Sequence, residues 1–112
     1  LQGSACAFDL LRQPGVTQVR LADVDVANLP AFLPTADPRL VPVTLDVRQH
    51  EQVLREFAQV DCVLSAIPYY FNGPLAALAV QAGVHFADLG GNTEIVFEQK
   101  RLHDAAVARG VT

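Results

Sequence analysis

The chain has 112 residues, 51% of them apolar and 18% charged, which gives room for one domain with a buried core and excludes a disordered segment. The formal net charge of −4, without a run of basic residues, gives no electrostatic support for nucleic-acid binding. No apolar run approaches the roughly 18 residues of a membrane span, and no export signal opens the chain. We therefore expect a cytoplasmic protein without a nucleic-acid or membrane partner.

Short β-branched runs alternate with helical patterns along the whole chain, which predicts parallel βαβ units. Three prolines, at positions 30, 34 and 38, predict a broken crossover over residues 26–39 instead of a regular helix. The other expected elements, in chain order, are a helix over 3–12, strands over 18–23 and 41–47, a helix over 49–59, a strand over 62–67, a helix over 72–83, a strand over 84–89 and a helix between 92 and 109.

Several residues set the expected limits of these elements. Asn72 is expected to cap the helix that follows it, while Gly83 and Gly110 are expected to end helices. Residues 62–67 form a continuous apolar run of the kind that is buried on both faces of a parallel sheet. Val111 and Thr112 resemble the first residues of another strand.

The order of elements predicts a doubly wound parallel sheet, Rossmann-like, that lacks its first strand and is cut before its sixth. In such a sheet the first strand lies in the middle, between the second and the fourth. Leaving its neighbours unpaired would cost about 1–3 kcal/mol per buried group, against a domain stability of about 5–15 kcal/mol. We therefore expect residues 1–112 to form one domain. Either this domain is a slice of a longer two-domain enzyme, or another segment supplies the missing strand.

Gly3 and Asp23 have the spacing of a dinucleotide site. There, the last glycine of a Gly-rich turn lets a helix pack closely on the sheet, and a carboxylate about 20 residues onward binds the adenosine ribose. The structural alternatives are a permissive helix glycine and a solvated turn carboxylate, and Asp25 fits either reading. A carboxylate at position 23 repels the 2′-phosphate of NADP, and Val24 supplies no cation, so NAD is favoured.

Asp46 and residues 65–68 each end an expected strand. Asp46 is either close to the adenine or a cap for the helix at Gln49. Ser65, Ala66, Ile67 and Pro68 are mostly small residues that let the backbone approach a dinucleotide, with Pro68 directing the chain outwards.

The aromatic residues at positions 69–71 cannot all face the core, so we expect at least one, Tyr69 or Phe71 ahead of Tyr70, to line the ligand site. Asp88 ends the next strand. The glycine pair at 90–91 permits positive φ and close ligand approach, and Asn92 and Thr93 either cap the last helix or contact ligand.

The remaining titratable residues are interpreted as structural. Cys6 and Cys62 lie far apart in apolar stretches and share no metal-ligand spacing, which favours structural thiols in a reducing compartment over a disulfide or a metal role. His85 is placed at the start of a strand, away from the ligand edge, and His50 and His103 on polar helix faces. No pattern of hydrolytic residues is present.

Taken together, five motifs resemble the saccharopine dehydrogenase family, in its amino-terminal nucleotide-binding domain, over the whole chain. The last two are most similar to the lysine 6-dehydrogenase-like branch. The motifs are Gly-Ser-Ala at 3–5 with Phe-Asp-Leu-Leu at 8–11, Leu-Ala-Asp-Val-Asp at 21–25, Leu-Asp-Val at 45–47, Ile-Pro-Tyr-Tyr-Phe-Asn at 67–72 and Asp-Leu-Gly-Gly-Asn-Thr at 88–93. Residues 26–38 depart from the family, which usually has a regular helix there.

We expect NAD as the cofactor and a homo-oligomeric full-length protein. The resemblance implies an NAD(P)-dependent oxidoreductase that transfers a hydride from a carbon bearing an amino-acid nitrogen. It places Gly3 at the pyrophosphate, Asp23 on the ribose, Asp46 near the adenine, and residues 65–68 beside the nicotinamide. For the substrate pocket it implies Tyr69, Phe71, Asn72 and Asp88, of which Tyr69 and Asp88 are the candidates for the chemistry.

Two other functions remain open. One is a regulatory domain that senses a nucleotide and has no chemistry of its own, which would not need the aromatic and amide loop at 68–72. The other is an α/β interaction domain without a ligand, which leaves the spacing of Gly3 to Asp23 unexplained.

Overall fold

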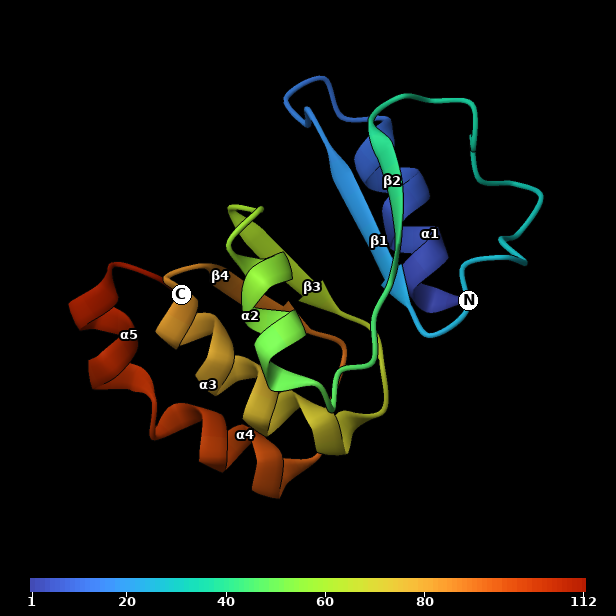
Figure 1. Cartoon of the computed structure of the whole chain (residues 1–112). Helices are drawn as coiled ribbons and strands as arrows, with labels where there is room; N and C mark the ends of the chain where they lie inside the picture. Colours follow the sequence, from blue (N-terminus) through green and yellow to red (C-terminus); the bar gives the residue numbers. More distant parts are fainter. The chain divides into compact units, whose positions relative to one another are not determined.

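The structure, a computed structural model, describes residues 1–112, which form two compact units, Leu1–Asp46 and Val47–Thr112 (Figure 1). Both units combine helices with parallel strands, so the predicted α/β class is confirmed. Each unit contains its own two-stranded sheet, and a single doubly wound sheet remains a proposal. None of the helices has the length and apolar character required to cross a membrane.

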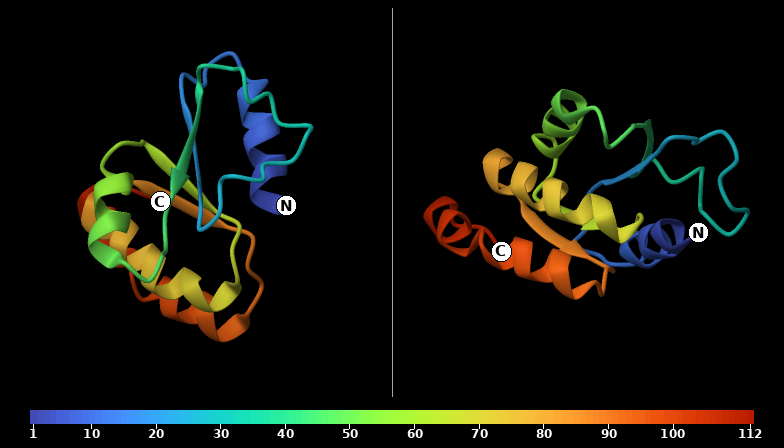
Figure 2. Two further views of the ribbon diagram at one scale, coloured as in Figure 1. Left: turned by 45° about the vertical axis from the view of Figure 1, so that its right-hand side comes forward. Right: turned by 90° about the horizontal axis from the view of Figure 1, so that it is seen from below.

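The first unit consists of α1 (Gln2–Leu11), β1 (Val19–Asp23) and β2 (Leu40–Thr44). The two strands pair in parallel, and α1 lies against them (Figure 2). Their contact buries a small apolar core, because each element turns one apolar face inward. The core residues are Ala7, Leu11, Val19, Leu33 and Leu40.

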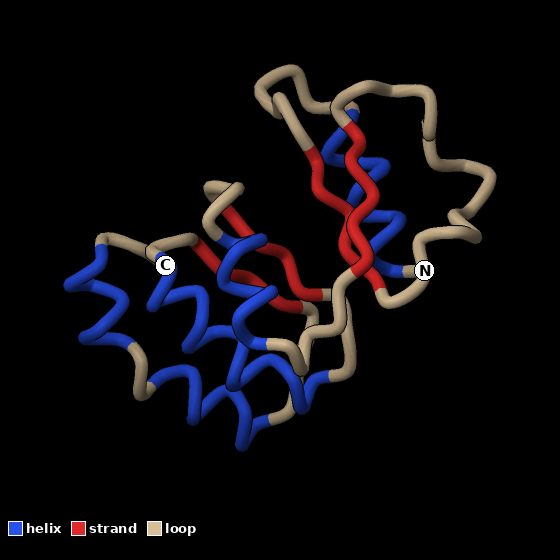
Figure 3. Tube along the Cα trace, in the orientation of Figure 1, coloured by secondary structure: helices blue, strands red, loops and turns tan.

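The segment between β1 and β2 contains only turns and bends, as the prolines predict (Figure 3). Arg39 fastens its end to the rest of the unit. The guanidinium of Arg39 donates to the carbonyls of Leu11 and Val16 and forms an ion pair of 2.8 Å with Asp37. These contacts hold the irregular segment against the end of α1.

The second unit contains two strands and four α-helices. β3 (Cys62–Ser65) and β4 (His85–Asp88) pair in parallel. Helix α3 packs against β4, and the other three helices all pack against α3 (Figures 1 and 2). The helices are α2 (His50–Phe57), α3 (Asn72–Ala82), α4 (Thr93–Lys100) and α5 (His103–Arg109).

Glycines end two of these helices, as expected. Gly83 after α3 has φ of 72° and Gly110 after α5 has φ of 69°, the left-handed conformation that favours glycine. Arg109 of α5 donates to the carbonyls of Val80 and Gln81 in the last turn of α3, which places a cation at the negative end of that helix.

The expectation that residues 62–67 form a strand buried on both faces is wrong. The strand ends at Ser65, and the side chains of β3 alternate between a covered and an open face, with Leu64 40% exposed. Cys62 is also exposed, so its predicted burial is wrong, although both cysteines are free thiols. Within this unit α3 packs against β4, and the alternating exposure along β3 is that of a half-buried sheet.

The predicted single helix between Asn92 and Arg109 is also wrong, because it breaks at residues 101–102. There, Arg101 N–H donates to the Glu98 carbonyl and Leu102 N–H to the Gln99 carbonyl, which tightens the last turn of α4 into i→i−3 bonds. Neither α4 nor α5 contains a fully buried residue.

Thr112 lies beside β4. Phe86 N–H donates to the Thr112 carbonyl over 2.8 Å, and Thr112 N–H donates to Nδ1 of His85 over 3.1 Å. These bonds support the expectation of a strand beginning at Val111 and give His85 the structural role predicted for it.

Candidate functional site

Two of the predicted ligand motifs meet at one edge of the second unit. Ser65 is the last residue of β3, Asp88 is the last residue of β4, and the two are partners in the parallel register. Because the carboxyl ends of parallel strands share an edge, the segments that follow them, 66–72 and 89–92, leave the sheet at the same end.

A buried hydrogen bond joins the end of β3 to the start of α3. Ser65 Oγ donates to Asn72 Oδ1 over 2.7 Å, and Asn72 is only 1% exposed. The expectation that Asn72 caps the following helix is therefore wrong. Asn72 is already the first residue of α3, the cap position belongs to Phe71, and the side chain of Asn72 is bound to Ser65 instead of the helix backbone.

The amide nitrogen of Asn72 has no hydrogen-bond partner although it is buried. A Cβ atom placed on Gly90 would lie 2.8 Å from Asn72 Nδ2 and 2.8 Å from Asp88 Oδ1. The donor of Asn72 and the acceptor of Asp88 thus both lie on the Cβ side of Gly90. Any side chain at position 90 would collide with both groups, which explains the glycine.

Asp88 is held by two neutral donors. Gly90 N–H donates to Oδ1 over 2.7 Å, and Gln99 Nε2 donates to Oδ2 over 2.6 Å. Each carboxylate oxygen retains a further lone pair for a ligand. The sequence analysis did not identify Gln99. A signal was present, since Gln99 is spaced three residues from both Val96 and Leu102 and therefore lies on the apolar stripe of the predicted helix.

The aromatic loop forms a single 3₁₀ turn, η1 (Tyr69–Phe71). Pro68 precedes it with φ of −53°, and Ala66 and Ile67 lie in the irregular segment after β3, where a strand was expected. The rings of Tyr69 and Tyr70 meet edge to face at 5.6 Å between centroids. Tyr69 is 49% exposed and Tyr70 57%, whereas Phe71 is half-buried. The turn therefore offers accessible aromatic surface beside Gly90, whose Cβ position lies 3.6 Å from Tyr69 Cβ.

The glycine pair differs from the expectation in one respect. Neither Gly90 nor Gly91 adopts the positive φ that glycine permits. Glycine is required at position 90 because a Cβ there would clash with Asn72 and Asp88, whereas a Cβ on Gly91 would meet nothing within 4 Å. The cap predicted for the next helix is confirmed, because Asn92 Oδ1 accepts from the backbone N–H of Glu94 and Ile95.

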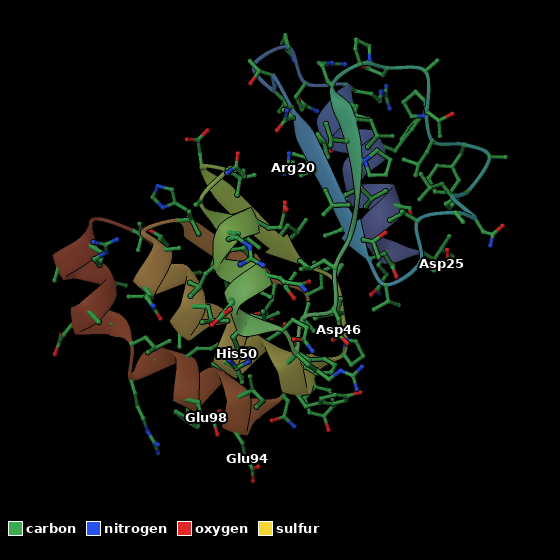
Figure 4. All side chains as sticks on the ribbon, viewed as in Figure 1. Arg20, Asp25, Asp46, His50, Glu94 and Glu98 are labelled. Carbon is green, nitrogen blue, oxygen red and sulfur yellow. The ribbon has the colours of Figure 1, made fainter.

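The first unit carries the other predicted ligand residues. Gly3 lies in the first turn of α1, and Asp23 ends β1 with an exposed side chain, as its proposed role requires. Asp23 Oδ1 accepts from Asp25 N–H over 3.2 Å, and Asp25 Oδ1 accepts from Ala27 N–H over 2.8 Å. Both carboxylates therefore also shape the turn after β1, where Figure 4 labels Asp25.

Asp46 lies two residues beyond the end of β2, because β2 loses its partner where β1 ends (Figure 4). The structural alternative for Asp46, a cap for the next helix, is wrong, because the cap position of α2 belongs to Gln49.

A mostly apolar pocket of about 750 Å³ lies within the second unit, lined by α3, β4, α4 and α5. Asp88 and Gln99 contribute to its wall. The pocket reflects the incomplete packing of α4 and α5, whose apolar residues are not fully buried. No group of three or more His, Cys, Asp or Glu side chains is arranged to hold a metal ion.

The model of one protein family, described as the saccharopine dehydrogenase NADP binding domain, matches residues 1–112. The match covers both compact units. No solved structure matches the chain significantly.

Proposed function

Since the chain belongs to the saccharopine dehydrogenase NADP-binding domain family, we propose that it binds the nicotinamide cofactor of an enzyme that oxidises a carbon–nitrogen bond of an amino acid. The family match supports the cofactor and the oxidoreductase class. In more detail, we propose that the substrate is lysine, saccharopine or a similar amino acid. The full-length protein would be a homo-oligomer, and a second domain would complete its active site.

The observation that carries the proposal is the pairing of Ser65 with Asp88 at the end of the second sheet. It brings two polar motifs to the edge at which open parallel sheets bind ligands. The residues there also fit a cofactor, because the buried amide donor of Asn72 lacks a partner within the chain.

We assign the adenosine part of the cofactor to the first unit. Gly3 lies in the first turn of α1, and we assign the pyrophosphate to that helix end, because the positive end of a helix attracts anions. Asp23 is assigned to the ribose hydroxyls and Asp46 to the adenine amino group. The exposure of Asp23 supports its role.

We assign the nicotinamide to the second unit, beside residues 65–68. Tyr69, Phe71, Asn72 and Asp88 then lie where the nicotinamide and the substrate meet. The bound cofactor supplies the hydride acceptor. Tyr69 Oη and Asp88 are the candidates in this chain for moving a proton at the substrate nitrogen, which requires contact within hydrogen-bond reach.

The family description names NADP, whereas the residues at the end of β1 favour NAD. The carboxylate of Asp23 would repel a 2′-phosphate, and the next residue, Val24, is 67% exposed and carries no charge to attract one. We therefore propose NAD as the preferred cofactor.

Titration calorimetry of NAD and NADP into the full-length protein tests this proposal. NAD is expected to bind at least tenfold more tightly than NADP, and Asp23→Asn is expected to abolish most of that preference. Asp25→Asn is the matched control, because it removes a carboxylate from the same turn. Absence of binding by either cofactor would overturn the proposed function. Binding without turnover of any amino acid would favour the regulatory nucleotide-sensing domain.

A further inference from the structure

The unpartnered donor of Asn72 is the most unusual polar group in the chain. An amide N–H that is buried without a partner costs about 1–3 kcal/mol, and native structures retain few such groups. Asn72 is 1% exposed and its Oδ1 is already fixed by Ser65. The acceptor for this donor must therefore come from outside the chain, for example from a bound ligand.

The surroundings of Asn72 fix the orientation of its amide. Asp88 Oδ1 lies on the same side of Gly90 as Asn72 Nδ2, each 2.8 Å from the position of a Cβ on Gly90. Reversing the amide would bring Asn72 Oδ1 towards the carboxylate, so that two acceptors face each other. The carboxylate thus favours Nδ2 on this side, as a donor beside an acceptor.

These two atoms select the chemistry of a ligand. A partner for both must accept a hydrogen bond from Asn72 Nδ2 and donate one to Asp88 Oδ1. An anionic acceptor would be repelled, since Asp88 is a carboxylate whose two donors, Gly90 N–H and Gln99 Nε2, carry no charge. A neutral primary carboxamide has both the carbonyl oxygen and the NH₂ group that the pair requires.

We propose that Asn72 Nδ2 and Asp88 Oδ1 together bind the carboxamide of the nicotinamide ring, an inference that rests on the proposed function. Gly90 lies against the donor. Because Gly90 is exposed and lies outside the helices and strands, the proposal includes a shift of its backbone that lets the ligand reach Nδ2. With Asp88 on the carboxamide, Tyr69 remains as the candidate in this chain for moving a proton at the substrate nitrogen, and Phe71 remains for the substrate.

The test compares four ligands by titration calorimetry on the full-length protein. NAD carries the carboxamide, 3-acetylpyridine adenine dinucleotide keeps only its carbonyl, nicotinic acid adenine dinucleotide carries a carboxylate, and ADP-ribose lacks the ring. The 2′-phosphorylated forms are used if NADP binds more tightly. NAD is expected to bind best, the acetyl analogue about three- to tenfold more weakly, and the acid at least tenfold more weakly.

Two variants complete the test. Asn72→Leu is expected to weaken NAD about tenfold and to leave ADP-ribose within about twofold. Asp88→Asn keeps an acceptor beside Gly90 N–H and is expected to remove the discrimination against the acid analogue. The second variant keeps the test decisive if the first does not fold.

Equal affinity of the unaltered protein for NAD and its acid analogue would overturn the carboxamide site and leave the proposed function intact. An equal loss of NAD and ADP-ribose affinity in Asn72→Leu would assign Asn72 a structural role and overturn the inference as well. Failure of the unaltered protein to bind any of the four ligands would overturn both proposals.

Discussion

Gln99 Nε2 donates a 2.6 Å hydrogen bond to Asp88 Oδ2, joining α4 to the end of β4. On the other oxygen, Gly90 N–H donates over 2.7 Å, so the carboxylate is fixed from two sides. The contact explains how a helix without a fully buried residue helps to orient a candidate ligand group. Gln99 is thus a positioning residue for Asp88.

Replacing Gln99 with leucine removes this donor while keeping most of the side-chain volume. The expected loss is about 1 kcal/mol of unfolding free energy, since one half-buried hydrogen bond to a charged group disappears. Urea denaturation measures it. Gln52→Leu, on an exposed position of α2, is the control and should change the stability by less than about 0.5 kcal/mol. An equal effect of the two substitutions would contradict the role of Gln99.

Alanine substitutions at positions 90 and 91 test whether each glycine is required by close contact with its neighbours or by its backbone conformation. Gly90→Ala places a Cβ 2.8 Å from both Asn72 Nδ2 and Asp88 Oδ1, and the expected cost is about 1–3 kcal/mol because one or both groups must move. Gly91→Ala meets no atom within 4 Å and is expected to be neutral or slightly stabilising. Thermal unfolding of the two variants gives the comparison, and a tolerant position 90 would refute the tight contact.

The cap of α4 gives another matched pair. Asn92 Oδ1 accepts from Glu94 N–H over 3.1 Å and from Ile95 N–H over 3.2 Å. Asn92→Ala is expected to cost about 1 kcal/mol, because two donors at the helix end lose their acceptor. Thr93→Ala, one residue onward, is expected to stay within about 0.5 kcal/mol. Urea denaturation distinguishes the two, and equal losses would argue against the cap.

Asp37 gives a prediction about pH. Its hydrogen bonds from the side chain and the backbone N–H of Arg39 lower the pKa of the Asp37 carboxyl below its ordinary value. A group with a lowered folded-state pKa stabilises the protein above its unfolded-state pKa of about 3.9, and this contribution is lost as the pH falls through the lower folded-state pKa.

A titration of the Asp37 carboxyl by NMR between about pH 2 and pH 6 measures this effect. Arg39→Gln is expected to raise the pKa of Asp37 towards its ordinary value, since the bonding cation is gone. Arg101→Gln, which removes a cation from the second unit, serves as the control and should leave the Asp37 titration unchanged. An unchanged Asp37 pKa in Arg39→Gln would show that the ion pair is absent in solution.

The helices and strands could be predicted because their signals are local. The apolar periodicity around Val53 and Phe57, and the glycines at 83 and 110, depend on neighbours within one or two turns. The break at Leu102 was not predicted, because the apolar stripe continues through it and only backbone hydrogen bonding shows where the turn tightens.

From the sequence alone, Ser65 and Asp88 could be placed at or near the ends of strands, which made both candidates for a ligand edge. The bonds that these residues form there depend on the fold. Asn72 looked like a helix cap, but the turn of η1 carries it back to Ser65, and Gln99 reaches Asp88 across eleven residues of sequence. Strand ends are set by short-range periodicity, whereas hydrogen-bond partners are set by packing between distant segments, which no local pattern specifies.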